Sequence, residues 1–256
     1  MNLSFEPAAI ENYRSKTQIA RVITENWVGG NMYCPRCGNP YIRHFENNRP
    51  VADFYCPNCK SEYELKSKAG RLGHKIADGA YGTMIDRIMS NHSPDFFFMS
   101  YSAENMSVTD FVVVPKHFFV PEMIEKRKPL AENARRSGWV GCNILIDKIP
   151  EQGRISVISN GSVCDAEAVV SKLNRSARLA VGNIESRGWL MDVLQCVNAL
   201  PEQTFTLNEM YAFEAELQIK HPQNQNIRPK IRQQLQLLRD RGFVEFLGSG
   251  EYRKIE

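Results

Sequence analysis

Two matched cysteine pairs are the feature that most constrains what this chain can fold into. Cys34-Pro35-Arg36-Cys37 and Cys56-Pro57-Asn58-Cys59 are C-x2-C turns separated by 18 residues. Such a turn points two thiolates at one ion, with sulfur–metal distances of about 2.3 Å, and two turns complete a tetrahedral zinc site. A redox dithiol is the alternative for a single pair, but two copies at this spacing favour zinc. We therefore predict a structural Zn²⁺ held by Cys34, Cys37, Cys56 and Cys59.

The other three cysteines and the overall composition limit the class of protein. Seven is an odd number of cysteines, which argues against a fully paired disulfide framework, and we expect Cys142, Cys164 and Cys196 to behave as small buried hydrophobes. The apolar runs are far shorter than the ~20 residues of a membrane helix. The first residues show no basic segment followed by an apolar one, so no signal peptide is expected. A cytoplasmic protein without a membrane partner is the prediction.

The first two thirds of the chain predict an α/β fold. A capping-box pattern at Ser15-x-x-Gln18 opens a predicted helix that Gly29-Gly30 ends. Alternating or β-branched apolar runs bounded by turn residues predict the strands, and helical spacing of apolar residues predicts a second helix. The predicted strands are 51–55, 61–67, 95–101, 109–114 and 154–159, and the second helix is 76–89. The order is α-β-β-α-β-β, followed by 154–159 as a further strand, with the cysteine turns built into the first hairpin.

From residue 183 the pattern becomes mainly helical. One helix ends at Pro201, a capping box at Thr206-x-x-Glu209 opens a second, and a third begins at Pro229 and ends at Gly242. Two short strands, 243–246 and 252–255, follow. Three helices and a hairpin are typical of a winged helix, a variant of the helix-turn-helix. We predict two domains, 1–182 and 183–256, with 171–182 as the linker.

Asp53, Glu64 and Lys66 form a candidate catalytic set. Side chains alternate along a strand, so Glu64 and Lys66 point the same way, and a hairpin brings Asp53 beside them. Two carboxylates at one point bind a hard cation such as Mg²⁺, and a nearby lysine stabilises charge on a phosphate or orients water. This chemistry is metal-assisted phosphodiester hydrolysis. The alternative is that Glu62, Glu64, Lys66 and Lys68 form one solvated strand face.

Local charge favours a nucleic-acid partner for the C-terminal part. The whole chain has 32 Lys and Arg against 29 Asp and Glu, but residues 218–256 carry eight basic and four acidic residues. The outer side of the third helix is predicted to present Arg232, Gln233 and Gln236, with Arg228 just before it. Arg suits guanine and Gln suits adenine in the major groove. A winged helix that binds protein is the alternative.

The catalytic pattern Asp53-x10-Glu64-x-Lys66 resembles the PD-(D/E)xK nuclease motif. The segment 44–56, with the cysteine turns around it, closely resembles the DpnI-type methyl-directed restriction endonucleases, as do the segments 135–144 and 231–236. The resemblance covers nearly the whole chain. One departure exists, because Pro50 lies three residues before Asp53 instead of adjacent to it.

This resemblance implies a bacterial type II endonuclease that cleaves double-stranded 5′-GATC-3′ when the adenine carries an N6-methyl group. It implies a PD-(D/E)xK core with an inserted four-cysteine zinc hairpin and a C-terminal winged helix. We expect the protein to be a monomer in solution, and whether two copies meet to cut both strands stays open. Asp53 and Glu64 would hold Mg²⁺, and Lys66 would complete the site.

Trp139, which follows Arg135-Arg136 and Gly138, is the candidate wall for the methyl group in the nuclease domain, and Arg135 is a candidate DNA contact. The alternative for Trp139 is a core tryptophan, as we expect for Trp27 and Trp189. Two other functions remain open: a zinc-ribbon and winged-helix regulator without catalysis, and a PD-(D/E)xK nuclease with a different target.

Overall fold

The computed structural model describes residues 1–7, 13–46, 52–90 and 92–255. It divides into two compact units, Met1–Ala177 and Arg178–Glu256, which we call unit 1 and unit 2. The division lies within the 3-10 turn Ala177–Leu179, which directly follows α3 (Ala166–Ser176).

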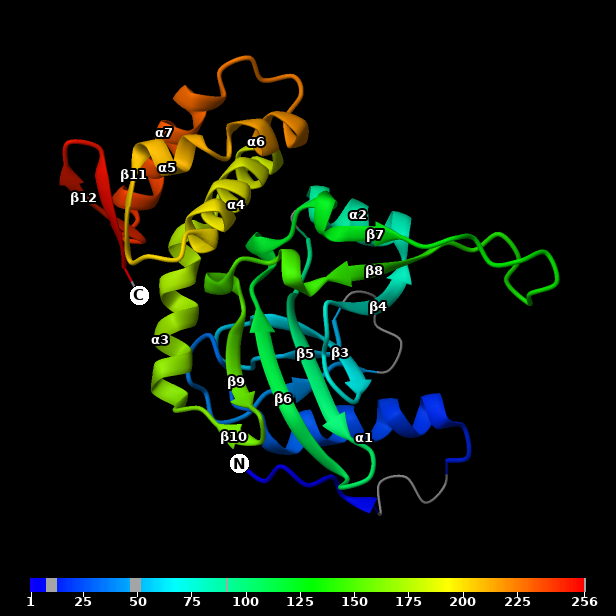
Figure 1. Ribbon diagram of the computed structural model, residues 1–256. Helices are drawn as coiled ribbons and strands as arrows, with labels where there is room; N and C mark the ends of the chain where they lie inside the picture. Colours follow the sequence, from blue (N-terminus) through cyan, green and yellow to red (C-terminus); the bar gives the residue numbers. More distant parts are fainter. Residues whose placement is uncertain (8–12, 47–51, 91, 256) are drawn as a thin grey trace. The chain divides into compact units, whose positions relative to one another are not determined.

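A seven-stranded mixed sheet forms the centre of unit 1 (Figure 1). Its strands lie in the order β1-β2-β3-β5-β6-β9-β10, and β3 is parallel to β5 while the other neighbours are antiparallel. The strands are β1 (Arg43–His44), β2 (Phe54–Tyr55), β3 (Glu62–Ala69), β5 (Asp95–Ser102), β6 (Ser107–Val114), β9 (Ile155–Ser159) and β10 (Ser162–Val163). The central strand β5 is buried along almost its whole length, which explains its continuous apolar sequence.

Two helices cover one face of this sheet. α1 (Lys16–Asn31) supplies Trp27 and α3 supplies Leu173 to a core that also contains Phe97 and Phe111 of the central strands. Trp27 is buried and its ring lies 5.7 Å from that of Phe111, which confirms the prediction that this tryptophan belongs to the core.

The opposite face of β5 carries Phe96 and Phe98, and Phe96 packs against Phe119 with ring centroids 4.9 Å apart. A second, three-stranded antiparallel sheet has the order β4-β8-β7, and α2 (Tyr81–Ser90) packs on all three strands. Its strands are β4 (Lys75–Ala80), β7 (Ile124–Lys126) and β8 (Gly141–Leu145). Short 3-10 turns connect the elements of this layer; they are Lys116–Phe118, Pro121–Met123, Ile146–Lys148 and Glu151–Gly153.

The first predicted helix forms, but its two ends differ from the prediction. The Ser15 side chain makes no capping hydrogen bond, so the predicted capping box is absent. The helix also continues through Gly29-Gly30 to Asn31, because Val28 and Met32 are buried and anchor its last turn. Gly29 allows the ring of His44 to approach closely, at 3.2 Å from the position a Cβ atom would occupy.

Two other predictions from local sequence were wrong. Residues 75–80 form strand β4 instead of the start of a helix, because they pair with β8 far along the chain, and only Tyr81–Ser90 is helical. The predicted linker 171–182 begins inside α3, whose Asp165 cap accepts a hydrogen bond from the Ala168 amide. Buried Val169 and Leu173 attach this helix to the core.

Unit 2 is a winged helix, as predicted. Its helices are α4 (Ile184–Ala199), α5 (Leu207–Tyr211), α6 (Glu214–Lys220) and α7 (Ile227–Asp240), and its sheet has the order β11 (Thr204–Thr206), β13 (Glu251–Lys254), β12 (Val244–Gly248). The capping box of Thr206 and Glu209 is present. Trp189 is fully buried in α4, which confirms its place in the core. The α/β class, the four-cysteine cluster and the C-terminal helix-turn-helix therefore all agree with the predicted fold.

No helix in the described ranges has both the length and the apolar character that a membrane crossing requires.

Candidate active site and metal centre

The four predicted zinc ligands meet at one point. Their sulfur atoms all lie within 4.8 Å of one another, and the Sγ–Sγ distances Cys34–Cys59 and Cys37–Cys56 are both 3.6 Å. A disulfide would need about 2.05 Å, whereas the edge of a zinc–sulfur tetrahedron measures about 3.8 Å. The cluster is therefore compatible with structural zinc. Among the described residues, it is the only group of three or more potential metal ligands.

The two cysteine turns share one backbone geometry. The Gly38 amide donates to the Cys34 carbonyl at 2.8 Å, and the Lys60 amide donates to the Cys56 carbonyl at 3.0 Å. Gly38 and Lys60 both have positive φ angles, 75° and 63°. The left-handed backbone conformation at these two residues closes both turns in the same way, so that the two thiols of each C-x2-C turn lie close together.

Hydrogen bonding prepares part of the cluster for metal. Burial raises the pKa of the Cys34 and Cys56 thiols. Burial also opposes ionisation of Cys37, but hydrogen bonds, among them those from the Asn39 backbone and the Asn58 side chain, lower its pKa to about 6. One thiol is therefore ionised at neutral pH, and binding of the metal has to displace protons from the buried ones.

The hairpin that carries the second cysteine turn also organises the candidate catalytic residues. The turn Cys56–Cys59 connects β2 to β3, and Asp53 directly precedes β2. The Asp53 amide donates to the Tyr63 carbonyl at 2.9 Å, and its side-chain Oδ2 accepts from the Leu65 amide at 2.7 Å. Asp53 is therefore bound to β3 on both sides of Glu64.

Tyr63 links the metal cluster to the same strand. Its hydroxyl lies 3.1 Å from Cys34 Sγ, and its ring stacks on Phe97 at a centroid distance of 4.4 Å. The Tyr63 side chain is fully buried and precedes Glu64 directly. Hydrogen bonds of this kind orient metal ligands, so Tyr63 connects the cysteine cluster to the strand that carries Glu64 and Lys66.

Glu64 and Lys66 form a buried charged network with two residues that sequence reasoning missed. Lys66 Nζ lies 2.6 Å from Glu64 Oε1 and also contacts Asp78 Oδ1, while Arg87 Nη1 lies 3.1 Å from Glu64 Oε2. The exposed fractions of the Glu64, Lys66 and Asp78 side chains are 13%, 16% and 5%. This burial disagrees with the alternative of a solvated strand face.

The network sets the charge of its members. Burial raises the pKa of Glu64, and attraction to Lys66 offsets part of that effect. Burial opposes the charged form of Lys66, but attraction to Glu64 and Asp78 raises its pKa above the ordinary lysine value. Lys66 is therefore an ammonium group at neutral pH, suited to stabilise negative charge and not to act as a base.

The sequence did not predict the roles of Asp78 and Arg87 because the segment that contains them was assigned to the wrong element. Their element was predicted to be a single helix, whereas Asp78 lies on β4 and Arg87 on α2. Residues 75–80 show no strict alternation of apolar and polar side chains, so the sequence offered no clear local signal for a strand there. Pro50, the proline of the predicted motif, lies outside the described residues.

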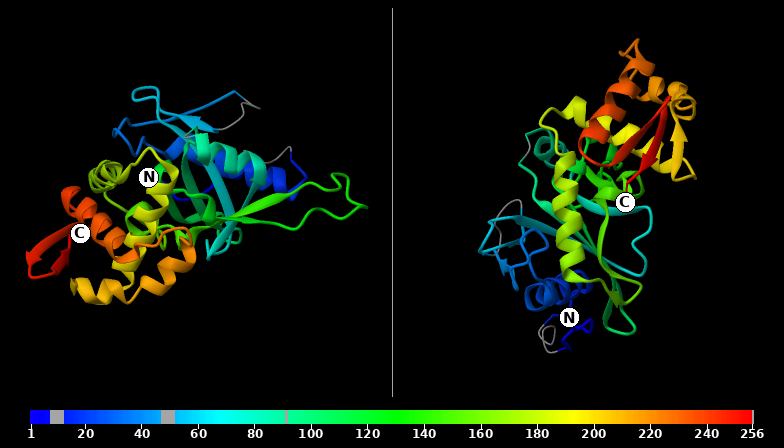
Figure 2. Two further views of the ribbon diagram at one scale, coloured as in Figure 1. Left: turned by 90° about the horizontal axis from the view of Figure 1, so that it is seen from above. Right: turned by 90° about the vertical axis from the view of Figure 1, so that its left-hand side faces the viewer.

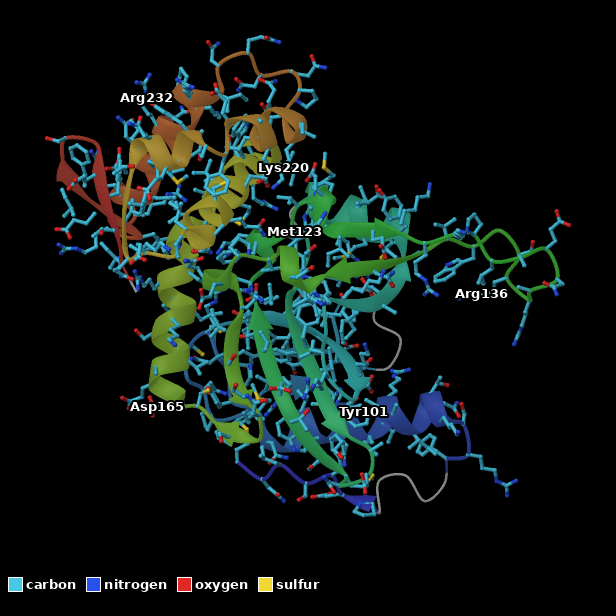
Figure 3. All side chains as sticks on the ribbon, viewed as in Figure 1. Tyr101, Met123, Arg136, Asp165, Lys220 and Arg232 are labelled. Carbon is cyan, nitrogen blue, oxygen red and sulfur yellow. The ribbon has the colours of Figure 1, made fainter. Side chains whose placement is uncertain are left out.

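The candidate methyl-reading residues lie on the connection between β7 and β8, which extends away from the body of unit 1 (Figures 1 and 2). Trp139 is half-buried and covers Gly141, and the Arg136 guanidinium lies 5.6 Å from its ring centroid. Arg135 is exposed, and Arg136 lies on the outer part of this connection (Figure 3). Trp139 is thus not a fully buried core residue, and its ring is also not fully exposed to solvent.

Helix α7 presents its predicted polar side to solvent. Ile231, Leu235 and Leu238 are buried, whereas Arg232, Gln233 and Gln236 are exposed and form no ion pair or side-chain hydrogen bond within the described chain (Figure 3). Arg228 differs, because its guanidinium is paired with Glu214 at 2.8 Å and lies over the Tyr211 ring.

Comparison with known families gives two matches that together span both units. The family model described as DpnI, the Dam-replacing family, matches residues 1–181. The model described as the Dam-replacing HTH domain matches residues 185–254.

Proposed function

Since this chain belongs to the DpnI or Dam-replacing family of restriction nucleases, we propose that it is a type II endonuclease that hydrolyses double-stranded DNA at GATC sites carrying N6-methyladenine. One observation carries the catalytic part of the proposal: a buried Glu64–Lys66 pair, 2.6 Å apart, lies on the strand to which Asp53 is hydrogen-bonded. The enzyme would be a monomer in solution and would work in the bacterial cytoplasm.

The proposed roles follow from the chemistry of the side chains. Asp53 and Glu64 hold the divalent metal, for which their carboxylate oxygens are suitable ligands. When bound, an ion such as Mg²⁺ stabilises charge on the phosphate and lowers the pKa of water. The Lys66 ammonium group orients the attacking water and stabilises the phosphate oxygens. Water adds to phosphorus, one ester bond breaks, and the leaving oxygen takes up a proton.

Recognition is assigned to both units. In unit 2, the exposed residues Arg232, Gln233 and Gln236 read base edges in the major groove. Arg228 contacts a phosphate after its ion pair with Glu214 breaks. In unit 1, Trp139 offers an aromatic wall to the adenine methyl group and Arg135 contacts the backbone. One buried methyl contributes only ~0.8 kcal/mol, so two methyl groups read by two units would be needed for strong discrimination.

A digest of one plasmid tests the function. The plasmid is prepared with and without adenine methylation at GATC and incubated with the protein in Mg²⁺ or in EDTA. Cleavage of the methylated plasmid alone, and only with Mg²⁺, is the expected result. Cleavage of both forms would retain the nuclease but contradict the methyl dependence. Absence of cleavage by folded, zinc-containing protein would favour the non-catalytic regulator.

The contacts of α7 give a second expected result. Replacing Arg232 or Gln236 with Ala is expected to weaken binding to a methylated GATC duplex by about 1–3 kcal/mol per lost base contact. The matched control is Gln223→Ala, an exposed glutamine before the helix. Fluorescence anisotropy with the methylated duplex and an unrelated duplex measures the effect. Equal weakening on both duplexes would reassign these side chains to phosphate contacts.

A further inference from the structure

With Asp53 and Glu64 assigned to the metal, Asp78 in the charged network around Lys66 is a third carboxylate, one more than a two-carboxylate metal site needs. Asp78 contacts the Lys66 ammonium group from β4 of the second sheet, whereas Glu64 lies with Lys66 on β3. Its side chain is only 5% exposed. A carboxylate is costly to bury without a counter-ion, so its placement here requires Lys66 as its partner.

The local backbone is built to aim Asp78 inward. Ile76 and Asp78 are two residues apart on β4 and share a face, and Ile76 is buried. The β4–β8 pairing then shifts between Asp78 and Ala80, at Gly79. Irregularities of this kind redirect side chains next to active sites. α2 begins immediately afterwards and returns Arg87 to the other oxygen of Glu64.

The two ion pairs of the Glu64 carboxylate indicate the role of Asp78. In the structure, each oxygen of Glu64 is engaged by a cation, Lys66 on one side and Arg87 on the other. A Glu64 carboxylate that ligates a divalent metal can no longer be the sole anchor of Lys66. Asp78 is the remaining carboxylate that contacts the lysine.

We propose that Asp78 is a positioning residue, which keeps the Lys66 ammonium group at the reacting phosphate when Glu64 turns to the metal. The proposal rests on the proposed nuclease function. It assigns no contact between Asp78 and the metal, consistent with the fact that Asp53, Glu64 and Asp78 do not form a preassembled three-ligand cluster among the described residues.

Single-turnover cleavage by Asp78→Asn tests the proposal. With DNA and Mg²⁺ saturating, we expect the rate constant to fall by about 100-fold, the effect of misplacing a catalytic group. DNA affinity in Ca²⁺ and the Mg²⁺ concentration for half-maximal rate are expected to change less than threefold. The matched control is Asp110→Asn, a strand carboxylate hydrogen-bonded to Ser100 and to the Asn160 amide. If Asp78→Asn does not fold, Asp78→Glu, which displaces the carboxylate by one methylene, takes its place.

A double-mutant cycle separates positioning from a structural role. If Asp78 acts through Lys66, adding D78N to K66A lowers the cleavage rate no further, and the melting temperatures of the zinc-containing proteins without Mg²⁺ show coupling between the two sites. Independent losses of rate would overturn the proposal. So would wild-type cleavage by folded D78N, or a tenfold higher Mg²⁺ requirement with full maximal rate, which would make Asp78 a ligand. Inactivity of the wild-type protein would instead contradict the proposed function itself.

Discussion

Asp53→Asn protein is expected to bind methylated GATC duplex as wild type does and to cleave it at least about 10³-fold more slowly. The asparagine has nearly the same shape and can still accept the hydrogen bond that Oδ2 receives from the Leu65 amide. The substitution therefore leaves the β2–β3 hairpin intact and removes only the negative charge that the metal requires. A carboxamide oxygen is a weaker ligand for a hard divalent cation than a carboxylate.

The control for this experiment is Asp86→Asn, which neutralises an exposed carboxylate on α2. Cleavage is measured under single-turnover conditions, and binding is measured in Ca²⁺. If D53N cleaves within tenfold of wild type, Asp53 does not hold the catalytic metal. If it loses DNA binding and thermal stability together with cleavage, its role is structural.

Cys37→Ser protein is expected to lose zinc and with it the fold of unit 1, with a melting midpoint lower by roughly 10 °C or more. Structural zinc contributes an apparent ~10–16 kcal/mol, comparable with the ~5–15 kcal/mol that stabilises a whole domain. Cys37 is exposed, so a serine there should be almost neutral unless the thiolate binds metal. Loss of the ion would leave the buried Cys34 and Cys56 without the group that holds them together.

The matched control is Cys164→Ser, since Cys164 is half-buried and does not belong to the cluster. Metal content is determined by mass spectrometry and stability by scanning calorimetry, before and after chelation. Protein that is verifiably free of zinc but melts as before would show that the cysteine cluster has no structural metal. A large destabilisation by C164S would show that the effect of serine is not specific to the ligands.

Much of the fold could be predicted because the relevant signals are local. The C-x2-C spacing identifies the four cysteines that meet, and continuous apolar runs identify β5 and β6. The capping box at Thr206 identifies the start of α5. In each case residues close in sequence carry the physical cause, either a turn geometry or a hydrophobic period.

The predictions failed for segments whose secondary structure depends on residues far away in the sequence. Residues 75–80 have a helical spacing of apolar side chains, yet they form β4 because β8, about 65 residues later, supplies its hydrogen bonds. β7 and β8 were missed for the same reason, and so was the continuation of α1 through Gly29-Gly30, which depends on buried neighbours.

The sequence by itself determined the four cysteines that cluster, the alternation that puts Glu64 and Lys66 on one side of a strand, and the winged helix with its exposed polar face. These follow from periodicity and spacing within a single element. Only the tertiary structure decided that Asp78 and Arg87 complete the charged network and that Asp53 is hydrogen-bonded to both sides of Glu64. A buried charge is stable only when another element supplies its partner, and which element does so depends on the packing of the whole unit.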